Sequence, residues 1–150
     1  MARKFDRKLI LEDGSEYPGW GFGCKKDAVA ELVFNTSMAG YQEIISDPSY
    51  TDQAVVMTYP LIGNYGITDE DFETRFPTIS GLVVSEYNDQ PSNFRCSMTL
   101  SEIMEDYGIA GIEGIDTRRL TRSIRDLGSR RGIITDIGAD VAAGLAAIES

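Results

Sequence analysis

The first apolar runs of the chain, residues 8–12 and 15–22, lie on either side of Asp13-Gly14. This dipeptide between two such runs is typical of a β-hairpin with a two-residue turn. Pro18 cannot donate a backbone hydrogen bond, so it predicts an edge strand or a bulge in the second run. Trp20 lies between two glycines, and we expect it to be buried, with a partner-facing Trp20 as the alternative.

Further short apolar runs have the composition of buried strands. We predict strands at residues 32–34, 54–57, 81–84, 109–113 and 132–136. The acidic, irregular segment 67–80 is expected to be a long surface loop, and residues 87–96 a second loop.

Apolar residues recur at helical spacing over residues 38–45, which predicts a short helix. Pro48 should end it, because proline disfavours the helical conformation of the residue before it. The sequence Asp47–Tyr50 suits a type I turn, with aspartate first and proline second. Such a turn would hold the Ser49 hydroxyl in a defined direction.

A second helix is predicted over residues 100–107 from its apolar stripe. Thr99 and Glu102 have the spacing of a capping box, in which the two residues satisfy backbone N–H groups reciprocally. Gly108 is the expected C-terminal stop.

Two more helices are predicted near the end of the chain. Asp116 should cap a helix over 117–127, which ends at Gly128. The Ala-rich segment 140–148 either packs on the domain as a helix or begins a linker. Strands separated unevenly by helices, with one hairpin at the start, predict an α+β domain with a mixed sheet.

Length and charge narrow the class of protein. The 150 residues, 42% of them hydrophobic, predict one domain with a proper core, so we expect residues 1–150 to be a single unit. The net charge of −10 argues against a general nucleic-acid binder. No apolar run approaches about 18 residues, the length of a membrane span. The N-terminus lacks the pattern of a signal peptide, so a cytoplasmic protein is expected.

The chain has two cysteines and no histidine. Without histidine, Cys-His and Ser-His catalytic pairs cannot be built within these residues, nor can a His-ligated metal site. Cys24 and Cys96 are expected to be reduced thiols without a functional role, since an intracellular setting disfavours disulfides. A hydrolase using either cysteine is the least favoured reading.

Basic residues are concentrated in one segment. Of the 14 Lys and Arg residues, six lie within positions 118–131: Arg118, Arg119, Arg122, Arg125, Arg130 and Arg131. They form either a solvated face that pairs with nearby acids or a docking surface for a partner protein. A phosphate site is a third reading, disfavoured because no Gly-rich phosphate loop adjoins it.

Three motifs in order carry a resemblance to a known family. They read FNTSMAGYQEIISDPSY, TYPLIGNYG and GIDTRRLTRSIR. Together they resemble the amino-terminal domain of the small, glutamine-using subunit of carbamoyl phosphate synthetase, from about Leu9 to about Thr135. The resemblance implies a compact domain of the swivelling β/β/α type.

The resemblance also implies a function. The family makes carbamoyl phosphate from glutamine, bicarbonate and ATP for pyrimidine and arginine synthesis, as a heterodimer. Its small subunit hydrolyses glutamine with a cysteine in a second, carboxy-terminal domain and passes ammonia to the large subunit. The implied partners are the large subunit, that glutaminase domain and glutamine. No cofactor or metal is expected in this domain, because ATP and Mg²⁺ belong to the large subunit. Alone, the chain should have no glutaminase activity.

The resemblance assigns roles to particular residues. Ser49 matches a serine that reaches the glutamine site, and its hydroxyl can both donate and accept; a purely turn-stabilising serine is the alternative. Holding this loop is the expected role of Asn35, Thr36, Tyr41, Gln42 and Asp47. Docking to the large subunit is expected of Arg118, Arg119, Arg122 and Arg125. The alternative function is a self-standing protein-interaction module that uses the same helix.

Overall fold

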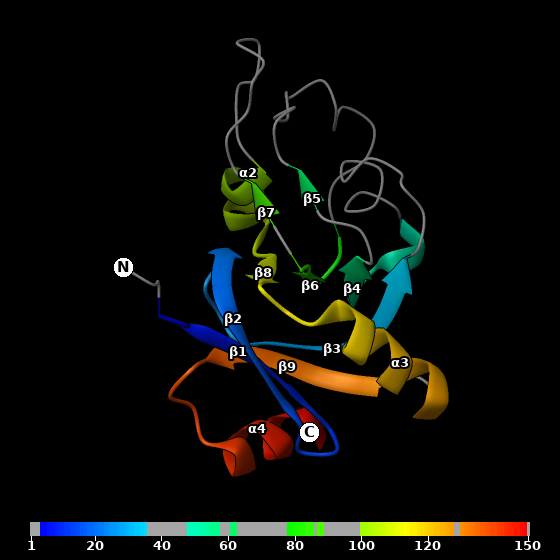
Figure 1. The fold of residues 1–150 in the computed structure, drawn as a ribbon. Coiled ribbons are helices and arrows are strands. Elements are labelled where there is room, and N and C mark those ends of the chain that lie inside the picture. The colour runs from blue at the N-terminus through cyan, green and yellow to red at the C-terminus, as the bar shows by residue number, and fades with distance from the viewer. Residues whose placement is uncertain are drawn as a thin grey trace, which may run out of the picture.

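A computed structural model describes residues 4–35, 48–57, 61–62, 78–85, 87–88, 100–127 and 130–149. Its centre is a closed barrel with the strand order β1-β2-β8-β6-β4-β3-β9 (Figure 1). The barrel strands are β1 (Arg7–Leu11), β2 (Glu16–Gly23), β3 (Ala28–Asn35), β4 (Gln53–Met57), β6 (Gly81–Val83), β8 (Ala110–Glu113) and β9 (Arg130–Asp136). All five strands predicted after the hairpin are confirmed.

The barrel is mixed and has helices packed against it, which is compatible with the predicted α+β class. Strands β3, β4, β6 and β8 run parallel to one another, whereas β1, β2 and β9 join them through antiparallel pairs. The predicted hairpin is confirmed, with Leu9 opposite Tyr17. Its turn has three residues instead of the predicted two, because the Leu11 N–H donates to the Ser15 carbonyl and residues 12–14 form the loop. Gly14 supplies the left-handed conformation of its turn, with a φ of 90°.

Pro18 marks neither an edge strand of the barrel nor a bulge in the pairing with β1, where consecutive residue pairs continue on both sides of it, so that prediction is wrong. Strand β2 has β1 on one side and β8 on the other. Pro18 lies opposite Lys8, whereas the pairing with β8 covers only Trp20 to Gly23. The proline therefore precedes the part of β2 that needs donors on both sides, which makes it compatible with a closed barrel.

Trp20 is half-buried and packs against Phe5, with ring centroids 4.8 Å apart. Gly114 gives it room, because a Cβ at that position would lie 2.6 Å from the indole ring. The prediction that Trp20 is buried is thus confirmed in part. Its indole ring packs against Phe5 and lies over Gly114 in the turn after β8.

The helices cover the outside of the barrel (Figure 1). Those within the described ranges are α2 (Leu100–Tyr107), α3 (Thr117–Leu127) and α4 (Val141–Glu149), and a 3₁₀ turn, η1, lies at Pro48–Tyr50. At the end of α2, Gly108 has a φ of 69° and the Ile109 N–H donates to the Met104 carbonyl at 2.8 Å. This Schellman geometry confirms the predicted glycine stop.

Helix α4 packs on the domain, which decides between the two readings of residues 140–148. Ile148 is buried against Ile10 and Ile133. Gly144 brings the helix close to the barrel, since a Cβ there would lie 2.8 Å from Ile10 Cδ1. The larger core cluster joins the barrel strands to α3: Leu9, Leu32, Val56 and Ile112 come from the strands, and Leu120 comes from the helix.

Some predicted elements lie outside the described residues: the helix over 38–45, the cap at Thr99 and the loop over 67–77. Residues 87–88 were expected in a loop, but Tyr87–Asn88 forms β7, which pairs in parallel with β5 (Leu61–Ile62). Within the described ranges, no helix is long and apolar enough to cross a membrane.

Candidate functional site

Ser49 lies in η1 and is exposed. The neighbouring Tyr50 fixes this turn to the barrel, because the Asn35 side-chain amide donates to the Tyr50 hydroxyl at 3.0 Å. Asn35 ends β3, so the bond joins the last residue of one strand to the turn before β4. The structure thus joins Asn35 to the turn that carries Ser49, through a tyrosine that sequence reasoning did not single out.

The other predicted loop residues, Thr36, Tyr41, Gln42 and Asp47, lie outside the described part of the chain. Their role in holding the loop stays a prediction.

Helix α3 begins at a capping residue, as predicted. The Asp116 carboxylate accepts from the Arg119 N–H at 3.0 Å, and the Asp116 carbonyl accepts from the Leu120 N–H. Leu120 and Ile124 are buried against the barrel, where α3 contacts β3 and β4. This packing fixes which face of the helix remains in solvent.

The outer face of α3 carries Arg118, Arg122 and Arg125, all exposed. Their i, i+4, i+7 spacing places them on one side of the helix, over about 10 Å of its length. We call these three residues the arginine stripe.

The stripe has no intramolecular partner among the described residues. None of its guanidinium groups lies within 4.0 Å of a described carboxylate, although the chain holds 24 acidic residues. Within those residues, the reading of a solvated face paired with nearby acids is therefore not observed. Three adjacent unpaired cations repel one another, and a carboxylate-bearing partner would relieve that repulsion.

Arg119 differs from the stripe, because its guanidinium carbon lies 4.6 Å from the centroid of the Tyr17 ring. Tyr17 is 4% exposed and belongs to the barrel core. A cation over an aromatic face is held there electrostatically. Of the four arginines predicted to dock a partner, Arg119 is thus engaged with the domain itself.

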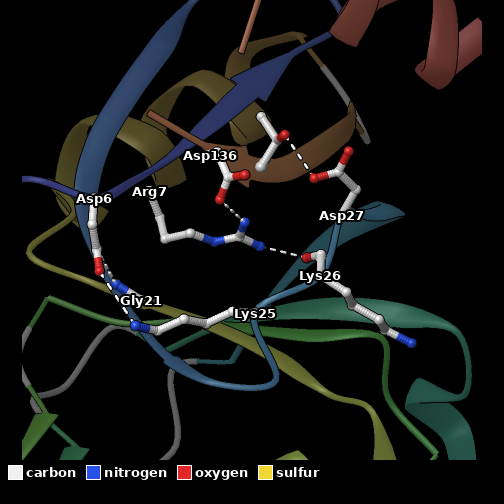
Figure 2. A network of polar contacts seen from close by, with 8 residues as sticks. Asp6, Arg7, Gly21, Lys25, Lys26, Asp27 and Asp136 are labelled. Carbon is white, nitrogen blue, oxygen red and sulfur yellow. Dashed lines mark hydrogen bonds and ion pairs between the residues drawn. The ribbon is translucent and has the colours of Figure 1, made fainter. Parts of the chain in front are cut away.

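A polar network at one end of the barrel holds the connection between β2 and β3 (Figure 2). Arg7 is 2% exposed, and its Nη1 donates to Asp136 Oδ1 at 2.8 Å while Nη2 donates to the Lys26 carbonyl. Asp6 accepts from the Gly21 N–H at 2.8 Å and lies 3.6 Å from Lys25 Nζ. The local sequence gives no signal for this network, since Arg7 and Asp136 meet only when β1 and β9 close the barrel.

The described residues contain no arrangement for bond-making chemistry. Cys24 is a free thiol, half-buried, and Cys96 lies outside the described part. No group of three or more Cys, Asp or Glu side chains able to hold a metal ion occurs in the described ranges. The fold therefore defines, over the residues that the structure describes, a mixed closed-barrel domain with helices packed against it.

Comparisons with known proteins identify the family. The model of the family described as carbamoyl-phosphate synthase small chain, CPSase domain, matches residues 9–134. The chain belongs to this family.

Three relatives, each a carbamoyl phosphate synthase small chain, give the extent of the similarity. The protein of Fusobacterium nucleatum is 56% identical over 137 residues, covering 91% of this chain and 38% of the relative. That of Staphylococcus saprophyticus is 50% identical over 144 residues, covering 96% and 39%. That of Oceanobacillus iheyensis is 56% identical over 130 residues, covering 87% and 36%. The chain thus spans less than two-fifths of the length of these relatives.

Proposed function

We propose that this chain is the amino-terminal support and docking domain of a glutamine-hydrolysing carbamoyl phosphate synthetase. The observation that carries the proposal is the family match over residues 9–134. In this proposal the complete heterodimer is a cytoplasmic ligase that makes carbamoyl phosphate from glutamine, bicarbonate and ATP. The domain itself is of the swivelling β/β/α type and contributes to pyrimidine and arginine synthesis without a cofactor of its own.

The proposed role of the domain is to hold the glutaminase domain in position on the large subunit. It supports the glutaminase domain and docks the pair on the large subunit, which binds ATP and Mg²⁺, so that ammonia is not lost to solvent. The glutaminase nucleophile belongs to that second domain. A chain without histidine has no imidazole to activate a thiol, so these 150 residues alone have no glutaminase activity in this proposal.

The arginine stripe is the proposed contact with the large subunit. Its three exposed guanidinium groups have no described carboxylate within ion-pair distance. Arginine forms bidentate bonds with carboxylates and is enriched at interfaces. The proposed partner is an acidic surface on the large subunit. Its carboxylates would pair with the three guanidinium groups, which pair with no carboxylate among the described residues.

Ser49 is the proposed contact with glutamine. Its exposed position in η1 leaves the residue accessible from outside the barrel, and the Asn35–Tyr50 bond anchors the turn that carries it. A hydroxyl can donate to or accept from the polar groups of the substrate. Its role is positioning of a substrate whose bond is broken in the neighbouring domain.

Association with the large subunit tests the proposal. The double variant Arg118→Gln, Arg122→Gln should weaken the affinity about a hundredfold or more, since two charge-assisted bonds at about 1.5–3 kcal/mol each are at stake and about 1.4 kcal/mol is tenfold. The matched control neutralises Lys4 and Arg131, which are exposed and lie outside α3. Surface plasmon resonance with immobilised large subunit measures both variants.

Each outcome has a distinct meaning. Unaltered association of the Arg118, Arg122 variant would remove the arginine stripe from the interface. Equal weakening by the control would show that only net charge matters, which also contradicts a specific stripe. Failure of the unsubstituted chain to bind the large subunit would favour a self-standing interaction module over the proposed docking domain.

A further inference from the structure

A hollow of about 340 Å³ lies where the chain leads into the four parallel strands of the barrel. Lys26 and Asp27 precede β3, Asp52 precedes β4, and Ser80 precedes β6. Because β3, β4, β6 and β8 are neighbours running in the same direction, these segments meet at one end of the sheet. The end of α2, with Gly108, completes the wall.

The hollow contains an ammonium group, that of Lys26, without a counter-ion among the described residues. Lys26 Nζ lies 3.1 Å from the point that a Cβ on Gly108 would occupy, at the C-terminus of α2. No carboxylate among the described residues lies within 4.0 Å of it. The Lys26 backbone is nevertheless fixed, since its carbonyl accepts from the buried Arg7 (Figure 2).

Two carboxylates with spare acceptor capacity line the same hollow. Asp27 uses Oδ1 to accept from the Thr135 hydroxyl at 2.7 Å, which leaves Oδ2 without a partner among the described residues. Figure 2 shows the side chains of Lys26 and Asp27 leaving the backbone in different directions, so their charges are held apart. The Asp52 carboxylate accepts no hydrogen bond from the described residues.

The backbone at Asp52 and Ser80 is pre-organised. Asp52 has a φ of 64°, a left-handed conformation that aspartate and asparagine tolerate better than most residues. The Asp52 N–H donates to the Thr78 carbonyl at 3.0 Å, and the Ser80 N–H donates to the Gln53 carbonyl at 2.9 Å. The carboxylate and the hydroxyl are thus presented from fixed positions, which lowers the entropy cost of binding.

The charges and hydroxyl groups of the side chains that line the hollow indicate the class of ligand that it can bind. The two carboxylates disfavour a simple anion, and the Lys26 ammonium together with the absence of a third described acidic or thiol ligand disfavours a metal ion. The charged and hydroxyl side chains disfavour an apolar ligand. A molecule with one negative and one positive group satisfies both signs at once.

We propose that this hollow binds a small zwitterion, a free α-amino acid. The ligand carboxylate pairs with Lys26 Nζ, and the ligand ammonium lies with Asp52 and Asp27, while Ser80 supplies a hydroxyl. The site is distinct from the arginine stripe and does not depend on the docking role proposed for it.

An amide NMR titration of the 150-residue chain tests the proposal with three probes. Glycine carries both charges, whereas acetate and methylammonium carry one each. Glycine should shift the amide signals of residues 26–29, 52, 80 and 108, and neither single-charge probe should do so at the same concentration. Shifts of the same size with acetate or methylammonium, or no shift at these residues with glycine, would overturn the proposal.

Two charge-neutralising variants complete the test. Lys26→Gln and Asp52→Asn should each weaken glycine binding about tenfold, as expected for the loss of one charge-assisted bond. Asparagine preserves the left-handed conformation at position 52, so the fold is retained. The control is Lys25→Gln, the adjacent exposed lysine outside the hollow, which should leave binding unchanged. Undiminished binding in either test variant would contradict the assignment.

Discussion

The Arg7–Asp136 pair makes a prediction about which partner matters more to stability. Arg7 is 2% exposed and Asp136 is 78% exposed, so the guanidinium is buried and the carboxylate is mostly in water. Replacing Asp136 with alanine leaves a buried cation with the Lys26 carbonyl as its only acceptor in this network. Replacing Arg7 with methionine removes the buried charge, together with the guanidinium N–H groups that need hydrogen-bond acceptors.

The magnitudes follow from this asymmetry. Removing one partner of a buried ion pair costs about 3–5 kcal/mol, and the exposure of Asp136 lowers the expected cost of Asp136→Ala to about 2–3 kcal/mol. Arg7→Met loses two hydrogen bonds but regains the desolvation cost of the charge and keeps most of the side-chain volume, so we expect about 1 kcal/mol.

Urea unfolding of the 150-residue chain measures both free energies by linear extrapolation. Asp136→Asn is the control, because its amide oxygen still accepts from Arg7 and its cost should lie below that of Asp136→Ala. An Arg7→Met variant less stable than Asp136→Ala would refute the reasoning, since the buried residue would then contribute more than the burial of its charge costs.

Three further predictions test separate features. In the complete enzyme, Ser49→Ala should reduce carbamoyl phosphate synthesis from glutamine and leave synthesis from free ammonia nearly intact; equal loss with both nitrogen sources would indicate a folding or assembly defect. Thr121→Val should raise the unfolding free energy by roughly 1 kcal/mol, because the buried Thr121 hydroxyl has no hydrogen-bond partner among the described residues, and a loss of stability would contradict this. Gly114→Ala should cost about 1–3 kcal/mol and red-shift the fluorescence of Trp20, the single tryptophan, because φ is 83° there and the new Cβ would meet the indole ring. An unchanged spectrum would show that the ring does not pack as described.

Local patterns were sufficient to predict most regular elements. Asp13-Gly14 predicts the hairpin because the turn chemistry is local, although the loop that forms has three residues, 12–14, with Gly14 in the left-handed conformation. Asp116 predicts the start of α3, and Gly108 the end of α2, since capping depends only on neighbouring backbone groups. These signals are short-range, and the structure confirms them.

Contacts made by closure of the barrel could not be predicted in the same way. Arg7 looks like a solvent-exposed cation in sequence, yet it is 2% exposed and meets Asp136 across β1 and β9. Pro18 suggested an edge strand because the sequence does not reveal where the pairing with β8 begins.

The candidate site also combines features that the local sequence predicts with features that depend on long-range contacts. The clustering of arginines on α3 is visible in the sequence, but the separation of Arg119 from the arginine stripe depends on the long-range contact with Tyr17. Likewise, the motif marks Ser49 and Asn35, whereas the hydrogen bond that anchors them uses Tyr50. The hollow beside Lys26 has no sequence signal, since four strands must be parallel neighbours before its lining residues meet.

Hydrogen–deuterium exchange on α3 tests the central claim most directly. When the large subunit is added to this chain, the amides of residues 117–127 should exchange more slowly, because a partner covers the exposed arginine stripe. The Arg118→Gln, Arg122→Gln variant should lose that protection. Unchanged exchange in α3 while the two proteins are bound would contradict the account, because docking would then use another face of the barrel.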